Sequence, residues 1–386
     1  MRQMTLAFTL VLFVGGNSLL AEEQDPPLDW QRAQQLFQRS QKGETLSPED
    51  QAYLERAKRA RQQQGANQRS PAQTSPAPGG KDAVGLLPLS ELGAGQYKGE
   101  DGGLYGGGKN EPPEAHRAAA KEALAKIVPL DPDGKPSKDG MIAFISMSMS
   151  NATMEFSRFK QVADADKDKS PLLTIVDCAQ GGKAMAQWAS ADAPTWVEAE
   201  RRLKAAGVAP SQVQVAWVKL ANMGPTGDLA KHGRKLQSDT LQLLQIAKKR
   251  FPNLQIAYLS SRIYGGYATS GLNPEPYAYE GAFAVRWLIQ DQIAGKPELN
   301  YYPAKGEVKS PLLLWGPYLW ADGQTPRKED GLTWERKDLS PNDGTHPSDS
   351  GRQKVAELLL KFFKTDPLAK TWFVKAGAEP KNMPEK

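Results

Sequence analysis

Cysteine and histidine are scarce in this chain, whose 386 residues include one cysteine and three histidines. A single cysteine cannot form an internal disulfide, and the apolar segment around Cys178 predicts a buried thiol. No cysteine comes directly after the amino-terminal apolar segment, so we expect no lipoprotein anchor.

An excess of charge of either sign is also lacking. The chain has 49 Lys and Arg residues against 44 Asp and Glu residues, so its net charge of +5 is a small difference between large mixed totals. The sequence shows no basic stripe with interleaved aromatic residues. Because nucleic-acid binding depends on such basic surfaces, we expect no nucleic-acid partner.

Long apolar runs are missing except near the amino terminus. Residues 1–21 combine Arg2, an apolar run over Leu6–Val14, and small or polar residues that lead to Ala21. A membrane span needs about 20 apolar residues, so this run is too short for one and is typical of a secretory signal peptide. We therefore predict a secreted or periplasmic protein without a membrane span. Leu19 fits a cleavage site after Ala21 poorly, so the cleavage position stays open.

Two helices and a linker are predicted before the main domain. Residues 22–64 carry apolar residues at helical spacing, and Ser47 followed by Pro48 is a typical helix start, which predicts a helical hairpin. Residues 65–113 are rich in Gly, Pro, Ser and Gln, which predicts a flexible linker followed by an ordered glycine-rich loop.

Beyond residue 113, strand-like apolar runs alternate with helical stretches. The five predicted strands are Met141–Met147, Leu172–Ala179, Val213–Leu220, Leu254–Ser260 and Leu312–Tyr318. The predicted helices are Ala152–Gln161, Thr195–Ala206, Leu229–Arg250, Tyr277–Ile293 and Ser350–Phe363. This alternation predicts an α/β fold in which helices cover both faces of a five-stranded parallel sheet, a three-layer α/β/α sandwich. We expect this domain over residues 114–365 and a tail over residues 366–386.

The candidate functional residues follow the predicted strands, because ligands of parallel sheets bind at the carboxyl ends of the strands. Ser150 follows the first strand on a turn into a helix, where its hydroxyl would be exposed beside backbone N–H groups that stabilise an oxyanion. Gly181 and Gly182 follow the second strand and would let the backbone approach a ligand closely. A helix cap at Ser150 and an ordinary turn at the glycines are the alternatives.

Polar side chains also follow the third and fourth strands. Lys219 and Asn222 come at the end of the third strand, and either could support an oxyanion. Arg262 follows the fourth strand. It could fix an acid or sugar group of a substrate, or it could pair with Glu275 or Glu280.

A loop after the fifth strand contains the segment Asp-Gly-Thr-His-Pro, which ends just before the last predicted helix. Only His346 follows a strand with a carboxylate three residues earlier; His116 and His232 do not. Asp343 could hold one ring nitrogen of His346 while the other accepts a proton from Ser150. A solvated Asp–His turn is the alternative. Because four such features fall on one predicted sheet edge, we interpret them together as a Ser–His–Asp site.

These segments resemble the SGNH/GDSL hydrolase superfamily, whose sequence blocks supply a nucleophilic serine, a glycine, an asparagine and an Asp-x-x-His pair in this chain order. Within it, the chain is most similar to carbohydrate esterases of the sialate O-acetylesterase and acetylxylan esterase type. Met149–Asn151 resembles their Gln-Ser-Asn block, and Ala179–Gly182 with Trp188 resembles their Ala-x-Gly-Gly block. The resemblance covers roughly residues 141–363.

The resemblance implies a flavodoxin-like SGNH fold and a serine esterase that needs no cofactor or metal. Ser150, Asp343 and His346 would be the catalytic residues. The N–H groups of Ser150 and Gly182 and the amide of Asn222 would form the oxyanion hole. Further candidates for substrate binding are Asn151, Gly181, Lys219 and Arg262. The implied substrate is an acylated carbohydrate, with acetyl as the expected acyl group, or another small ester.

Departures from the family pattern leave alternatives open. The glycine that usually lies two residues before the nucleophile is Ser148 here, so Ser148 is an alternative nucleophile. The third block fits neither family pattern fully, so Lys219 is an alternative to Asn222 as the oxyanion donor. The alternative functions are a lipid or thioester hydrolase, an acyltransferase with the same triad, and a catalytically silent binding or cell-envelope protein.

Two further sets of residues have weaker interpretations. Asp131–Gly134 and Asp164–Asp168 resemble fragments of calcium loops, but neither has the full ligand pattern, so we predict no metal site. The aromatic residues Trp315, Tyr318 and Trp320 could form a sugar-stacking surface or pack in the core.

Overall fold

The computed structural model describes residues 46–67 and 81–375, together with residues 28, 29, 32, 33, 35, 36, 39 and 377. The chain divides into two compact units, residues 1–76 and residues 77–386. The predicted signal peptide lies outside the described residues, as do residues 68–80 of the predicted linker and the end of the predicted tail.

The amino-terminal unit contains helix α2, Pro48–Asn67. The Ser47 hydroxyl accepts a hydrogen bond from the N–H of Asp50 at 3.1 Å, so Ser47 caps the helix and Pro48 takes its first position. Leu54 of α2 packs with Leu36 and Leu46 in a small apolar cluster. Described positions between residues 32 and 39 are helical, but the predicted first helix falls partly on residues that are not described, so the hairpin stays a prediction.

The main unit is built on a five-stranded parallel sheet. Its strands are β3 (Ile142–Met147), β4 (Leu173–Asp177), β5 (Val213–Lys219), β6 (Ile256–Ser260) and β7 (Leu312–Trp315). Their order across the sheet is β4-β3-β5-β6-β7, and all neighbours are parallel. The chain therefore moves from β3 to one side and then to the other, as in flavodoxin-like folds. The predicted sheet is confirmed, strand for strand.

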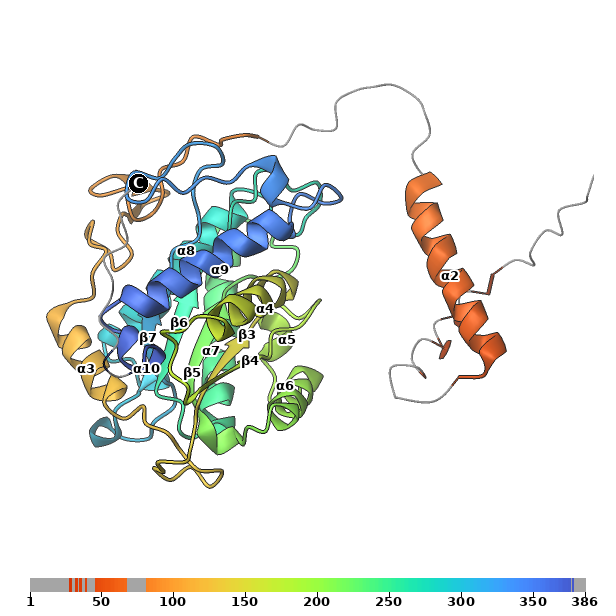
Figure 1. The fold of residues 1–386 in the computed structure, drawn as a ribbon. Coiled ribbons are helices and arrows are strands. Elements are labelled where there is room, and N and C mark those ends of the chain that lie inside the picture. Colours follow the sequence, from red (N-terminus) through yellow and green to blue (C-terminus); the bar gives the residue numbers. More distant parts are fainter. Residues whose placement is uncertain are drawn as a thin grey trace, which may run out of the picture. The chain divides into compact units, whose positions relative to one another are not determined.

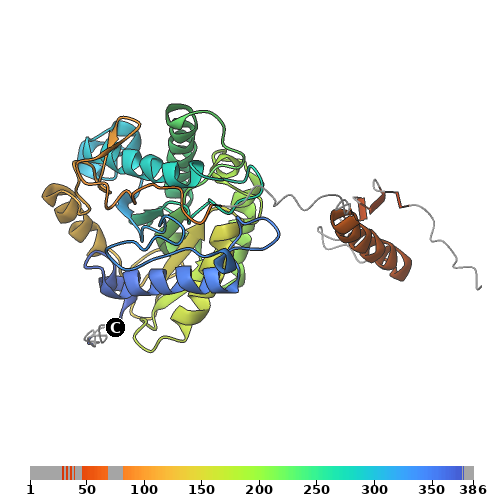
Figure 2. The same ribbon diagram turned by 90° about the horizontal axis from the view of Figure 1, so that it is seen from above.

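Helices cover both faces of this sheet (Figure 1). The helices of the main unit are α3 (Glu114–Leu124), α4 (Ser150–Asp164), α5 (Met185–Trp188), α6 (Pro194–Ala205), α7 (Arg234–Arg250), α8 (Tyr277–Ile293), α9 (Asp349–Thr365) and α10 (Lys370–Phe373). Helices α4 and α9 pack against each other on one face, and α7 and α8 pack against each other on the other face (Figures 1 and 2). The three-layer α/β/α prediction is confirmed.

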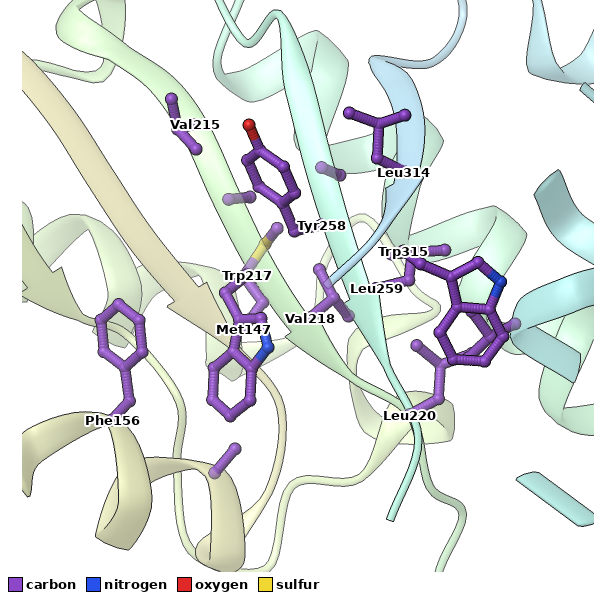
Figure 3. Close-up of a cluster of buried hydrophobic side chains, with 14 of the residues drawn as sticks. Met147, Phe156, Val215, Trp217, Val218, Leu220, Tyr258, Leu259, Leu314 and Trp315 are labelled. Carbon is purple, nitrogen blue, oxygen red and sulfur yellow. The ribbon is translucent and has the colours of Figure 1, made fainter. Parts of the chain in front are cut away.

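The core lies on both faces of the sheet, because every residue of β3, β5, β6 and β7 is buried. Figure 3 shows buried side chains from four strands of the sheet, together with Phe156 of α4 on the side of Trp217. Phe156 of α4 stacks on Trp217 of β5 with ring centres 5.5 Å apart. The aromatic residues Trp315, Tyr318 and Trp320 are also buried, so they pack in the core and do not form a sugar-stacking surface.

The main unit is larger than the predicted residues 114–365. Strands β1 (Gln96–Tyr97) and β2 (Glu100–Asp101) pair before it, and Tyr97 donates a hydrogen bond to Glu280 of α8 at 2.6 Å. At the other end, Phe373 is fully buried in the main core. Residues 81–113 and 366–375 therefore belong to the main unit, and the predicted bounds of this domain were too narrow.

None of the helices in the described part of the chain combines the length and the apolar character that a membrane crossing requires.

Candidate functional site

Ser150 begins α4 directly after β3, the strand from which the chain proceeds to both sides of the sheet. Ligands bind at this switch point in open parallel sheets. Met149 before it is extended, with φ −97° and ψ −170°, so the chain turns sharply between strand and helix. The Ser150 Oγ atom lies 2.7 Å from Nε2 of His346.

His346 lies in the loop that leads into α9, and Asp343 holds its ring. The Nδ1 atom of His346 is 2.6 Å from Oδ2 of Asp343, and Oδ1 accepts the N–H groups of Thr345 and His346 at 2.9 and 3.0 Å. Burial acts to raise the pKa of Asp343, but these hydrogen bonds and the histidine outweigh it, so the pKa lies below its usual value. Asp343 is thus a carboxylate at neutral pH and orients the ring.

Gly344 makes this tight turn possible. Its φ is +59°, a conformation that favours glycine, and an added Cβ would lie 1.8 Å from the carbonyl oxygen of Tyr267. The glycine inside the Asp-x-x-His segment is therefore required by the turn that brings the two side chains together.

Ser148 is not available as an alternative nucleophile. Its side chain is fully buried, and its hydroxyl donates to the carbonyl of Lys219. It does not line the pocket that contains Ser150 and His346. Between the two serines, the structure gives only Ser150 contact with both the histidine and the pocket.

Ser150 and Gly182, whose backbone N–H groups are the candidates for an oxyanion hole, both line the pocket. The N–H of Ser150 is at the start of α4, where the first N–H groups of a helix have no partner within the helix. Gly182 lines the same pocket with φ +70°, and a Cβ on it would meet no atom within 4 Å, which leaves room for a ligand.

Asn222 also lines the pocket, and its amide is held in one orientation. Its Oδ1 accepts the N–H of Ala186 at 2.9 Å, and its Nδ2 donates to Asp239 at 2.6 Å. Because an amide nitrogen carries two hydrogens, one donor remains for a ligand. The sequence analysis did not predict a role for Asp239. Its position between Leu236 and Leu243, on the buried face of α7, nevertheless indicates that the aspartate has a polar partner.

Replacing Asn222 with alanine is expected to lower ester turnover by about 100- to 1000-fold, because an oxyanion donor acts mainly in the transition state. The effect should appear in kcat, with KM little changed, when steady-state kinetics are measured on a small ester. Asn300→Ala, which removes an amide that does not line the pocket, is the control. Equal kinetics for the two variants would contradict the role of Asn222.

The structure corrects two of the candidates for substrate binding. Lys219 is fully buried, and its Nζ lies 2.6 Å from both carboxylate oxygens of Glu155, so it reaches neither substrate nor oxyanion. Gly181 is exposed but does not line the pocket. The side chain of the strand-end lysine folds back into the core because a buried carboxylate on α4 pairs with it.

Asn151 and Arg262 do line the pocket, and both contact the residue before His346. The Asn151 amide donates to the carbonyl of Thr345 at 2.8 Å, and Arg262 donates to the same oxygen at 3.4 Å. Asn151 therefore connects helix α4 to the loop that carries His346.

The pocket is small and largely apolar at its sides. Its volume is about 50 Å³. The residues that line it are Met149, Ser150, Asn151, Gly182, Ala184, Ala221, Asn222, Met223, Arg262, Leu272, Asn273, Thr345 and His346. A water molecule needs about 10–15 Å³ of such space, so the enclosed part of the pocket holds a group of a few heavy atoms.

Among the described residues, no group of three or more His, Cys, Asp or Glu side chains is placed to hold a metal ion. In the acidic segments, Asp166 and Asp168 pair with Lys364, and Asp131 accepts N–H groups of its own turn.

Glu275 accepts three hydrogen bonds inside the main unit and predicts a pH dependence of stability. Burial raises its pKa from 4.5 to about 6, although Trp320, Gly265 and Tyr279 donate hydrogen bonds to it. Between these values the folded protein binds more protons than the unfolded chain, so this contribution to stability is present below pH 4.5 and is lost as the pH rises through 6. Its size is about 2 kcal/mol.

This dependence is measured by urea unfolding of the wild type and Glu275→Gln between pH 4.5 and 7.5. The free energy of unfolding of the wild type should fall, relative to that of the variant, as the pH rises. A difference that stays constant across this range would contradict the assignment to Glu275.

No protein-family model and no curated protein sequence matches the chain. Solved structures that match include the Bacillus subtilis protein YXIM, at 11% identity over 60% of this chain and 57% of that chain, with a TM-score of 0.32. Another is the periplasmic domain of a lipopolysaccharide acetyltransferase from Salmonella ser. Paratyphi A, at 12% identity over 64% of this chain and 96% of that domain, with a TM-score of 0.32.

A third is a gut microbial diltiazem-metabolizing enzyme, at 15% identity over 59% of this chain and 47% of that chain, with a TM-score of 0.29. The chain thus spans less than two thirds of the first and third of these proteins. Similarity at this level establishes neither a family nor an activity for the chain.

Proposed function

We propose that this protein is a secreted or periplasmic serine esterase that removes O-acetyl groups from carbohydrate. The observation that carries the proposal is the hydrogen-bonded series Ser150–His346–Asp343, which opens on a pocket at the switch point of the sheet. A helix cap explains Ser150 and a solvated turn explains Asp343, but neither explains why the three side chains meet beside a pocket.

The proposed reaction is acyl transfer in two steps. The Ser150 Oγ attacks the ester carbonyl while Nε2 of His346 takes the hydroxyl proton, and the negative charge on the carbonyl oxygen faces the N–H groups of Ser150 and Gly182 and the Asn222 amide. The C–O bond to the alcohol then breaks, and His346 returns the proton to the leaving oxygen. Water attacks the acyl-enzyme with His346 again as base, which releases the acid and restores Ser150.

The size of the pocket supports a small acyl group. A volume of about 50 Å³ fits a group of a few heavy atoms, such as acetyl, whereas a long acyl chain would need a deeper channel. The apolar side chains of Met149, Met223 and Leu272 offer a surface for the methyl group. Carbohydrate as the alcohol part rests on the resemblance of the segments at Ser150 and Gly182 to those of carbohydrate esterases.

Acetate release from p-nitrophenyl acetate and from acetylated xylan tests the proposal. Wild type should release acetate from both, and Ser150→Ala from neither above background. Transfer of the acetyl group to an added alcohol at a higher rate than to water would identify an acyltransferase with the same triad. If no acetate were released from any ester, the esterase proposal would be contradicted and a binding function would be favoured. Cell fractionation tests the proposed export.

A further inference from the structure

Asp177, the last residue of β4, has a side chain that accepts hydrogen bonds from several segments near the site. Three hydroxyls donate to it, those of Ser146 and Thr153 at 2.5 Å and that of Ser157 at 2.7 Å. The N–H of Ala179 donates to the same carboxyl group at 3.1 Å. Burial raises the pKa of Asp177, and the hydroxyls that donate to it act against this rise. The two oxygens of Asp177 thus take four donors.

These donors come from both segments that carry the candidate N–H groups of the oxyanion hole. Thr153 and Ser157 lie one helical turn apart on α4, and Thr153 is three residues after Ser150. Ala179 is three residues before Gly182, in the loop that follows β4. One carboxyl group therefore connects the start of α4 to the loop of Gly182.

Ser146 extends the connection to β3, the strand that leads to Ser150. It is fully buried, and it lies opposite Asp177 in the sheet. Its Oγ donates to Asp177 and accepts the N–H groups of Cys178 and Ala179, both at 3.1 Å. The hydroxyl thus fixes the direction in which the chain leaves β4 toward Gly182.

We propose that Asp177 is a positioning residue that holds the N–H groups of Ser150 and Gly182 at the spacing that an oxyanion requires. It does not line the pocket, so it acts through the two segments and not on the substrate. The inference rests on the proposed esterase function. Oxyanion donors act mainly in the transition state, and a displacement of about 1 Å can lower turnover by about 100-fold.

A backbone hydrogen bond also joins these parts of the chain, from the N–H of Gln180 to the carbonyl of Ser148 at 3.0 Å. Because this bond does not depend on Asp177, we expect the Asp177→Asn variant to fold with the two segments displaced. Asparagine has nearly the same shape as aspartate, but its amide replaces one acceptor oxygen with a donor. It therefore cannot accept from all four donors.

Steady-state hydrolysis of p-nitrophenyl acetate by Asp177→Asn tests this role. The value of kcat should fall by about 10- to 100-fold, with KM little changed. Asp322→Asn is the matched control, because Asp322 is also a buried carboxyl group and accepts the N–H groups of Val84 and Gly85 without lining the pocket. It should keep the wild-type kcat. Wild-type kcat in Asp177→Asn, or an equal loss in the two variants, would overturn the inference.

The hydroxyl of Thr153 allows a second test with a smaller change. Thr153→Val removes the hydroxyl at nearly constant shape and should also lower kcat, whereas Thr153→Ser restores the hydroxyl and should recover the lost rate. When Thr153→Val is combined with Asp177→Asn, the loss should be smaller than the product of the two single losses, because both changes break the same contact. Losses that multiply fully would contradict this.

Hydrogen–deuterium exchange separates this inference from the esterase proposal, because it needs no turnover. In Asp177→Asn, the N–H groups of residues 150–157 and 178–183 should exchange faster than in the wild type and in Asp322→Asn. If the wild type released no acetate but the variant showed this exchange, the esterase proposal would be contradicted and the role of Asp177 in holding the two segments would be supported. Unchanged exchange in both segments would overturn that role.

Discussion

Replacing His346 with glutamine should lower ester turnover by about 10⁴- to 10⁶-fold, because the proton of Ser150 then has no acceptor. The Oγ–Nε2 distance of 2.7 Å allows direct transfer in the folded protein, without a bridging water. The loss should appear in kcat, since the histidine acts on the reacting atoms and contributes little to binding of the ester. Steady-state assays with p-nitrophenyl acetate measure this loss in kcat.

A double replacement tests whether Ser150 and His346 act as one unit. Groups that act as one unit are not additive, so Ser150→Ala combined with His346→Gln should be no slower than either single variant. His116→Gln is the matched control, because His116 is buried beside the carbonyl of Leu313 and does not line the pocket. Retention of a large part of the activity in His346→Gln would mean that another group takes the proton.

Replacing Lys219 with methionine should destabilise the protein by about 3–5 kcal/mol, because it leaves Glu155 as a buried, unpaired charge. Both side chains are fully buried and 2.6 Å apart. Burial lowers the pKa of Lys219 to about 8 and raises the pKa of Glu155, so each charge depends on its partner. The free energy of unfolding in urea is the measurement.

The cost should depend on pH and on the partner. In Lys219→Met, Glu155 can be buried in its protonated form, so the loss of stability should shrink as the pH falls toward the usual range of a glutamate. Adding Glu155→Met should recover part of the loss, because removing both charges avoids the unpaired state. A double variant less stable than Lys219→Met alone would contradict this account of the pair.

The sheet could be predicted from the sequence because strands buried on both faces are continuously apolar. Leu312–Trp315 is such a strand, and Val213–Lys219 is one except at Gln214 and Lys219. Helices with one apolar face, such as α7, separate the strands. The domain ends could not be predicted in this way. Phe373 is held by contacts with distant segments, and Tyr97 by a glutamate in α8, and neither contact leaves a periodic signal in the local sequence.

The candidate site likewise contains residues that the sequence predicts and residues that it does not. Ser150, Gly182, Asn222 and His346 were found because each follows a strand, and parallel topology brings strand ends together. Lys219 is the last residue of β5, yet this position does not indicate whether its side chain points to the pocket or to Glu155. Asp239 supports Asn222 from α7, 17 residues further along the chain. Its place on the buried face of the helix indicates that it has a partner, but which partner depends on side-chain packing that the spacing does not encode.

Covalent labelling with a fluorophosphonate, mapped by mass spectrometry, tests most directly whether His346 activates Ser150. We expect one adduct, on Ser150, in the wild type and in Ser148→Ala, and none in Ser150→Ala. An adduct that persists in Ser150→Ala and disappears in Ser148→Ala, or a folded wild-type protein that does not react at all, would contradict the account.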